Sequence, residues 1–192
     1  MKLDAYERSR LRKIARLCPP GTVLDLGHAQ YPNPFFEGVI RTGVDLAPSR
    51  GPVRYEEELL GDVTDLGAVL GTRTFDTVVA GELLEHVERP YDLLRDLRRF
   101  VAPGGRLVLS TPNPVGWPCL LFEWLRSRRF YYTSEHRYYF PPRWVERMLE
   151  DCGYAVERVA GVGLLVPFVT PPCPPSLAYQ VVYVARPEGR GP

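Results

Sequence analysis

The chain has 192 residues, of which 45% are hydrophobic and 24% charged, and its formal net charge is +1. This length suits one globular domain with a sizeable core, and the near-neutral charge gives no global reason to expect nucleic acid as a partner. No apolar run approaches the ~20 residues of a membrane span, and the charged N-terminus lacks the apolar core of a signal peptide, so we expect a cytoplasmic protein without a transmembrane segment.

The N-terminal part of the chain predicts a helix followed by two strands. Residues 4–17 predict an amphipathic helix, because their apolar side chains lie close to one helical face. The β-branched run over residues 21–27 predicts a buried strand that ends in a tight turn at Gly27. A second short strand, residues 43–44, ends in Asp45.

The next segments carry weaker signals. We expect a short helix around residues 35–36, a helical turn at residues 55–59 and a weak third strand just before residue 61. A short helix up to Leu70 follows, with Asp65 as its N-terminal cap.

A clearer strand, helix and strand unit comes next. Residues 75–80 predict a strand, residues 90–100 predict a helix that ends before the Pro-Gly-Gly of residues 103–105, and residues 106–110 predict another buried strand. This spacing implies parallel pairing through right-handed crossovers.

The C-terminal part changes character. An apolar helix is expected within residues 117–125, a further helix over residues 143–152, and two β-rich segments over residues 154–159 and 178–185. We expect a disordered tail over residues 187–192. The four cysteines form no C-x-x-C pair, which predicts neither a zinc site nor a disulfide framework.

The strand ends carry the first functional signal. Asp45 follows Asp25, the aspartate of the first strand, by about 20 residues, which is the spacing at which a doubly wound sheet offers a carboxylate to the hydroxyls of a ribose. The dinucleotide fingerprint is absent, because His28-Ala29-Gln30 follows Gly27 where further glycines would bind a pyrophosphate. The pattern favours a nucleoside without phosphates over NAD or FAD; aspartates that only cap turns are the alternative.

Five stretches resemble, in the right order, the motifs of class I S-adenosylmethionine-dependent methyltransferases. The resemblance is to the branch of small single-domain enzymes that includes quinone-biosynthesis and natural-product methyltransferases. The stretches are VLDLG, GVDLAPS, GDVTDL, FDTVVAGELLEHV and APGGRLVLSTPN. Residues 135–159 also resemble the family's region leading into its last helix and hairpin. The match spans most of residues 20–160.

The resemblance implies an α/β fold with a Rossmann-like, doubly wound, seven-stranded sheet, order 3-2-1-4-5-7-6, strand 7 being antiparallel. It implies one domain over residues 1–186 and S-adenosyl-L-methionine as the cofactor. Residues 117–140 are expected to form an acceptor-side lid, because they follow the fifth strand and are rich in aromatic side chains. Gly27 would let the backbone approach the methionine part, Asp45 would hold the ribose diol, and Asp62 would meet the adenine. The residues expected to bind the cofactor are Asp25, Gly27, His28, Asp45, Leu46, Asp62, Val63, Gly81, Glu82 and Leu83.

The chemistry of methyl transfer determines whether the acceptor side of the site needs a base. Methyl transfer from a sulfonium is an in-line displacement, so a base is needed only when the acceptor is a hydroxyl or a carbon acid. His86, after the fourth strand, and His136 are the catalytic candidates, and Tyr131, Tyr132 and His136 are expected to contact the substrate. For both histidines local structural packing is the alternative.

The expected function is methyl transfer to a small-molecule acceptor, such as a quinone precursor, a sugar or a lipid-like molecule. A non-catalytic cofactor-binding partner subunit is one alternative, because the loop at residues 27–30 departs from the family's G-x-G-x-G. The aromatic, arginine-rich residues 126–139 suggest an RNA methyltransferase as another, and the apolar residues 117–125 allow contact with a membrane surface. Glu82 and Glu85 lack a matching His or Asp cluster, so no metal is expected. The acceptor's identity and the oligomeric state stay open.

Overall fold

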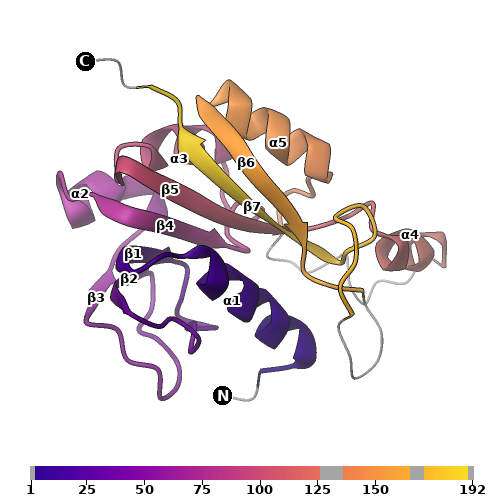
Figure 1. Cartoon of the computed structure of the whole chain (residues 1–192), viewed down its shortest axis with the longest axis horizontal. Coiled ribbons are helices and arrows are strands. Elements are labelled where there is room, and N and C mark those ends of the chain that lie inside the picture. The colour runs from indigo at the N-terminus through magenta and orange to yellow at the C-terminus, as the bar shows by residue number, and fades with distance from the viewer. Residues whose placement is uncertain (1–2, 126–135, 165–170, 190–192) are drawn as a thin grey trace.

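The computed structural model describes residues 3–125, 136–164 and 171–189. Its centre is a seven-stranded sheet with the order β3-β2-β1-β4-β5-β7-β6 (Figure 1). Strands β3 to β5 pair in parallel, and β7 is antiparallel to both β5 and β6, so the predicted order and the antiparallel strand 7 are confirmed. The strands are β1 (Gly21–Leu26), β2 (Val39–Asp45), β3 (Glu57–Leu60), β4 (Phe75–Gly81), β5 (Val101–Pro112), β6 (Tyr154–Gly161) and β7 (Gln180–Pro187).

Helices cover the two faces of the sheet unequally. One face packs against α2 (Leu66–Leu70), α3 (Pro90–Leu97) and α5 (Pro142–Asp151), and the other packs against α1 (Ala5–Leu17). A 3-10 turn, η1 (Val63–Asp65), precedes α2, and α4 (Trp117–Trp124) stands clear of the sheet beyond the end of β5 (Figure 1). None of the described helices is long and apolar enough to cross a bilayer.

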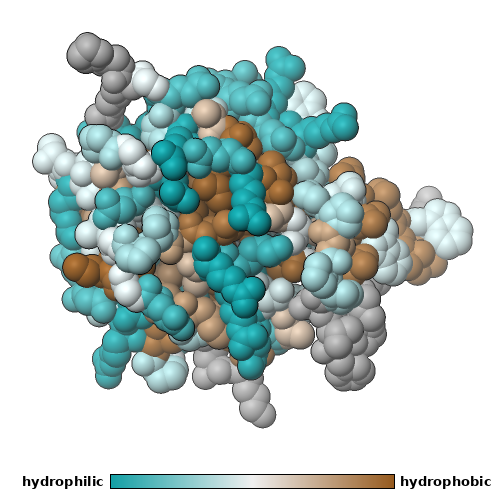
Figure 2. Space-filling view, viewed as in Figure 1, coloured by the Kyte–Doolittle hydropathy of each residue, from teal (hydrophilic) through white to brown (hydrophobic). Residues whose placement is uncertain are grey.

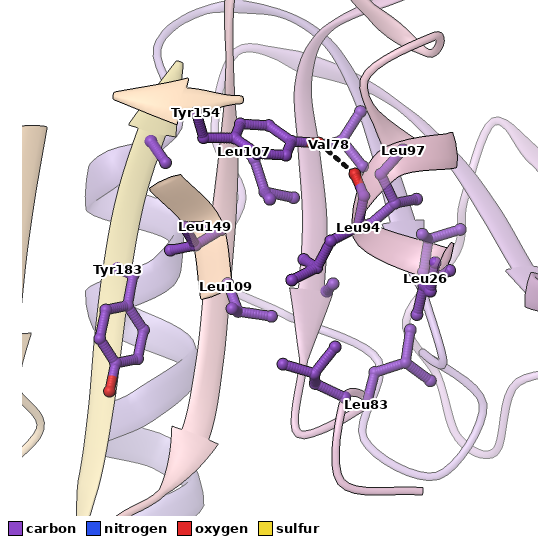
Figure 3. Packing of buried hydrophobic residues seen from close by; sticks show 14 of the residues in the cluster. Leu26, Val78, Leu83, Leu94, Leu97, Leu107, Leu109, Leu149, Tyr154 and Tyr183 are labelled. Atoms are coloured by element: carbon purple, nitrogen blue, oxygen red, sulfur yellow. Dashed lines mark hydrogen bonds between the residues drawn. The ribbon is translucent and has the colours of Figure 1, made fainter. Parts of the chain in front are cut away.

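Alternate residues of each central strand build two separate cores, because successive side chains of a strand point to opposite faces. Val78 faces the larger core while its neighbour Val79 faces the core under α1. Figure 3 shows the larger core, where the Tyr154 hydroxyl donates a 2.9 Å hydrogen bond to the Leu94 carbonyl. This bond satisfies the only polar atom of a fully buried tyrosine side chain. Both cores hold the strand ends in fixed register.

Several local expectations are corrected. Residues 35–36 form a turn rather than a helix. The expected third strand before residue 61 is confirmed as β3, but it occupies residues 57–60, so the helical turn expected at residues 55–59 is wrong. Helix α3 ends at Leu97, and β5 begins already at Val101, because the pairing of β4 with β5 shifts register and accommodates residues 103–105 as an irregularity within the strand.

Caps and tail also differ from expectation. Asp65 makes no side-chain capping bond to α2; instead Asp62 caps η1 by accepting bonds from the backbone and the hydroxyl of Thr64. At the other end of the chain, the backbone N–H of Glu188 donates to the Gly153 carbonyl at 2.8 Å, which ties residues predicted to be disordered to the sheet. Of the expected lid, residues 126–135 lie outside the described part of the chain.

Candidate functional site

A cavity of about 220 Å³ lies where β1 and β4 end. Its floor includes Gly27 and Gly81, one wall comes from α1, and the rim includes His86 and His136. Gly27 has φ +71°, a conformation that favours glycine, and it forms the turn at the end of β1. The carboxyl edge of a parallel sheet is where α/β proteins bind ligands, so this feature, called here the edge cavity, is the candidate site.

Arg10 places a buried positive charge in the wall of the edge cavity. It shares the inward face of α1 with Leu11 and Ile14, is 4% exposed and forms an ion pair with Glu7. Burial lowers the pKa of the Arg10 guanidinium, but Glu82 and Glu7 raise that pKa by more, so the net shift is upward. Arg10 is therefore a permanent cation facing the space above Gly81, where a Cβ atom would lie 2.8 Å from Nη1.

Glu82 lies beneath this cation in a strained backbone conformation. Its φ is +51°, which is uncommon outside glycine, and its carboxylate accepts hydrogen bonds from the Ser110 hydroxyl at 3.1 Å and the Gln180 amide at 3.2 Å. Burial raises the pKa of Glu82, while Arg10 opposes the shift. Arg10, Glu7, Glu82 and Gln180 form one buried network, called here the α1 network.

Asp25 is tied into the floor of the edge cavity. The Tyr55 hydroxyl donates to its Oδ2 at 2.5 Å and accepts the backbone N–H of Asn33 at 3.2 Å. Burial raises the pKa of Asp25, and the bond from Tyr55 lowers it in part. Asp25 therefore fastens the loop after Gly27 from below as well as lining the cavity.

His28 occupies space that a glycine leaves open. Its imidazole is buried, lies 4.5 Å from the Tyr55 ring centroid, and would be 2.5 Å from a Cβ atom at Gly43. Among the described residues neither ring nitrogen has a hydrogen-bond partner, although Glu58 approaches Nε2 at 4.0 Å. The ring thus packs against β2 in the space that Gly43 leaves.

Asp45 ends β2 beside the same loop. Its Oδ2 accepts the Ala29 N–H at 2.8 Å and its Oδ1 accepts the Ala47 N–H at 3.2 Å. An ionised carboxylate has about four acceptor positions, so each oxygen can accept one further hydrogen bond. Asp45 can hold a diol while it also fixes the loop.

Other predicted cofactor residues lie outside the edge cavity. Asp62 is exposed and caps η1, Leu46 is 75% exposed, and Val63 lines a separate cavity of about 560 Å³ together with residues of α3. Leu83 is buried and lies 3.3 Å from where a Cβ atom of Gly27 would be. The predicted residues therefore divide between an enclosed end and an open end along the sheet edge.

The two candidate histidines meet at the rim of the edge cavity. Their ring centroids are 4.7 Å apart in an edge-to-face arrangement, and His136 Nδ1 lies 3.2 Å from the Tyr139 hydroxyl. The Arg137 N–H donates to the Glu85 carbonyl at 2.8 Å, which docks this segment on the loop after β4. Tyr131 and Tyr132 lie outside the described residues.

Glu85 adds a carboxylate to the histidine pair. Both of its carboxylate oxygens are buried without a hydrogen-bond partner among the described residues, and burial, followed by the charge of Glu82, raises its pKa well above the ordinary value. One ligand atom from each of Glu85, His86 and His136 lies within 4.8 Å of the others, a group that could hold a metal ion. The reason given for expecting no metal, the lack of a matching His or Asp cluster, therefore does not hold for Glu85, while the expectation of no metal stays a prediction.

Sequence reasoning missed the α1 network, although a signal was present. Arg10 follows Tyr6 by four residues and precedes Ile14 by four, so it lies on the inward helical face, whereas Arg8 and Arg12 do not. Gln180 carried no comparable signal, because only the sheet order brings β7 next to β5.

Comparison with known families identifies the chain's relatives. A family model described as "Methyltransferase domain" matches residues 5–159. The ubiquinone biosynthesis O-methyltransferase of Xanthomonas axonopodis pv. citri is 30% identical over 180 residues, covering 83% of this chain and 74% of that protein. The enzyme of the same name from Aeromonas salmonicida is 34% identical over 92 residues, covering 46% of this chain and 39% of its own length. This last match spans about two fifths of the relative.

Solved structures share the fold at lower identity. The CcbJ methyltransferase of Streptomyces caelestis has a TM-score of 0.66 at 16% identity, covering 97% of this chain and 91% of its own. The 1,6-didemethyltoxoflavin-N1-methyltransferase of Burkholderia thailandensis, solved with its substrate and S-adenosylhomocysteine, has a TM-score of 0.66 at 18% identity, covering 97% and 80%. These similarities support the fold.

Proposed function

The chain belongs to the methyltransferase domain family and is a class I S-adenosylmethionine-dependent enzyme by family and fold, and from this premise we propose that it methylates a hydroxyl group of a small organic molecule. The observation that carries the choice of a hydroxyl is the pair His86 and His136 at the rim of the edge cavity. A hydroxyl acceptor must lose a proton, and imidazole has a pKa suited to accept it near neutrality.

The residues present fit the cofactor. An α-carboxylate needs a cation, and Arg10 supplies a buried one in the cavity wall. A ribose diol needs acceptors, and the half-buried carboxylate of Asp45 has capacity left after its two backbone bonds. Gly27, whose positive φ favours glycine, has no side chain, so the turn between these two groups leaves room for the ligand.

The positions of these residues indicate which role each would have in methyl transfer. S-adenosylmethionine, when bound, supplies an electrophilic methyl on a sulfonium. Arg10 and Asp45 would fix its two ends, while the docked segment around His136 limits access of water from the rim. His86 or His136 would accept the acceptor's proton, and the buried carboxyl group of Glu85 lies close enough to both imidazoles to orient them.

A phenolic acceptor fits this site better than a sugar. An aromatic side chain, Tyr139, packs against the histidine pair, with its ring centroid 5.4 Å from that of His136. Aromatic groups of this kind bind flat apolar molecules. The ubiquinone biosynthesis O-methyltransferases among the relatives support the same choice.

The test is a transfer assay by mass spectrometry with S-adenosylmethionine and three acceptor types, namely catechols, sugars and short RNAs. We expect one added methyl on a catechol oxygen and none on the other two. Binding of S-adenosylhomocysteine, followed by calorimetry in parallel, separates a non-catalytic binder from an enzyme with another acceptor. Methylation of RNA alone, or of an amine alone, would contradict the proposal.

A further inference from the structure

Another cavity lies away from the edge cavity, in a groove between α1 and β6. Its volume is about 890 Å³, within the 300–1,000 Å³ range of ligand sites. The walls come from the outward side of α1, from β6 at the edge of the sheet, and from the segment around Pro172. We call this feature the α1–β6 groove.

Five cations line the groove, and none of the lining residues is acidic. They are Arg8, Arg12, Lys13, Arg16 and Arg158. None of the five forms an ion pair with an acidic residue in the described part of the chain. The neighbouring acid of β6, Glu157, is bound to Arg186 at 2.6 Å. The groove therefore carries an uncompensated positive charge.

This arrangement is unfavourable in the absence of an anion. Arg8, Arg12 and Arg16 follow one another at four-residue spacing on one helical face, where like charges destabilise a helix. Burial lowers the pKa of Lys13, and the charges of Arg158 and Arg16 lower it further. The Lys13 ammonium donates to the Gly161 carbonyl, which holds it at the junction between α1 and β6. A bound anion would relieve this repulsion.

The floor of the groove is apolar. The apolar residues that lie among the cations are Leu3, Leu17, Ala160, Val162 and Pro172. Figure 2 shows strongly hydrophilic side chains crossing a hydrophobic area in the middle of this view. A ligand that matches both parts needs an anionic head and an apolar body, because an inorganic anion would leave the floor exposed to water.

We propose that the α1–β6 groove binds an organic phosphate, an apolar molecule that carries a phosphate ester. Arginine pairs with phosphate through two parallel hydrogen bonds, and the groove offers arginines on both walls. Because α1 also carries Arg10 and Glu7 into the edge cavity, a ligand in the groove contacts the outward side of the helix whose inward side lines the candidate active site.

Calorimetry with decyl phosphate, inorganic phosphate and the uncharged decyl maltoside tests this inference. We expect decyl phosphate to bind more tightly than either of the others. The double variant Arg16→Ala/Arg158→Ala, which removes one cation from each wall, should weaken decyl phosphate binding by about tenfold or more. The control Arg54→Ala/Arg143→Ala removes the same charge from exposed positions elsewhere and should bind as the wild type does.

Two further measurements complete the test. Hydrogen exchange should show protection of α1 and β6 on addition of decyl phosphate, which locates the ligand. Sedimentation with phosphatidylcholine vesicles, with and without phosphatidic acid, separates a lipid headgroup from a soluble phosphate as the source. The inference would be overturned if the wild type did not bind decyl phosphate, or if it bound decyl maltoside as tightly as decyl phosphate. It would also be overturned if a folded Arg16→Ala/Arg158→Ala variant bound decyl phosphate as tightly as the wild type does.

Discussion

The two ends of the candidate cofactor site are built on different principles. At the enclosed end, Arg10 of α1 and Gln180 of β7 are both buried. The Gln180 amide donates a hydrogen bond to the carboxylate of Glu82. At the open end, Asp45 is half-buried, Asp62 is exposed, and both carboxylates already accept backbone bonds. Charges removed from water interact strongly, whereas exposed ones are weakened by solvent and salt.

This difference predicts where recognition is strict. The α1 network must keep its geometry whether or not a ligand is present, because the single cation, Arg10, is shared by the carboxylates of Glu7 and Glu82. The open end can tolerate substitutions, because water replaces lost contacts there. We therefore expect the methionine end to determine both stability and affinity, and the adenosine end to affect affinity alone.

The largest effect is expected for Arg10→Ala. It leaves Glu7 and Glu82 without their buried cation, and breaking a buried ion pair from one side costs about 3–5 kcal/mol. Urea unfolding measures the loss, and Arg8→Ala, on the outward side of the same helix, is the control, with an expected change within about 0.5 kcal/mol. Similar losses of stability in the two variants would show that the buried position of Arg10 does not matter for stability.

The next effect concerns turnover rather than stability. His136→Ala should lower the rate of methyl transfer by about 10²-fold, because a positioned base contributes at least that much. Affinity for S-adenosylhomocysteine should stay nearly unchanged, since His136 belongs to the rim. A matching loss of cofactor affinity would show that the histidine acts on the cofactor side instead.

At the open end, Asp45→Asn keeps an oxygen that can accept the Ala29 N–H but loses the charge. We expect cofactor binding to weaken by about 1.5–3 kcal/mol, the value of one charge-assisted hydrogen bond, with unchanged thermal stability. Calorimetry and a melting curve check both parts. Asp45→Ala is less informative, because it also releases the loop that the carboxylate holds. Unchanged binding in Asp45→Asn would rule out the ribose role.

The pH dependence of the free energy of unfolding tests the raised pKa of Glu85. Its folded-state pKa is raised above the ordinary value of 4.5, so the folded protein holds the proton more tightly than the unfolded chain does. Stability is therefore greatest at low pH with respect to this group and falls as pH rises from 4.5 through the raised pKa. His86, His136, Glu82 and Arg10 face the same region, so the difference between wild type and Glu85→Gln isolates its share. Glu85→Gln should flatten that fall, because glutamine does not titrate; identical pH profiles of unfolding would contradict this expectation.

The smallest effect is expected for Asp62→Asn. Asparagine still caps η1, and the exposed carboxylate interacts weakly, so cofactor affinity should change by less than about 1 kcal/mol. A tenfold or larger loss would place the adenine contact in a more enclosed site than the structure shows.

The fold was predictable because each strand end carries its own local signal. The resemblance of five ordered stretches implied the strand order, and the turn at Gly27 and the end of β2 at Asp45 lie where the patterns placed them. Local rules failed at residues 103–105, where a Pro-Gly-Gly sequence suggests a break but pairing between β4 and β5 continues. Sheet pairing prevailed over local propensity there.

The site was less predictable, because its contacts are long-range. Glu85 and His136 are 51 positions apart in the sequence, and the docking of the segment after residue 135 brings them together. Arg10 is one of several arginines in α1, and only its helical phase marks it. Which titratable groups meet in three dimensions depends on tertiary packing, which a single sequence reports only indirectly.

Arg10 is the residue that we expect to recognise the carboxylate of the cofactor's methionine end. The most direct measurement compares calorimetric binding of S-adenosylhomocysteine with that of methylthioadenosine, which lacks the amino acid group, in wild type and in Arg10→Gln. We expect wild type to prefer S-adenosylhomocysteine by about tenfold or more, and Arg10→Gln to lose that preference while it binds methylthioadenosine normally. Equal weakening of both ligands, or an unchanged preference in a folded Arg10→Gln protein, would contradict the claim.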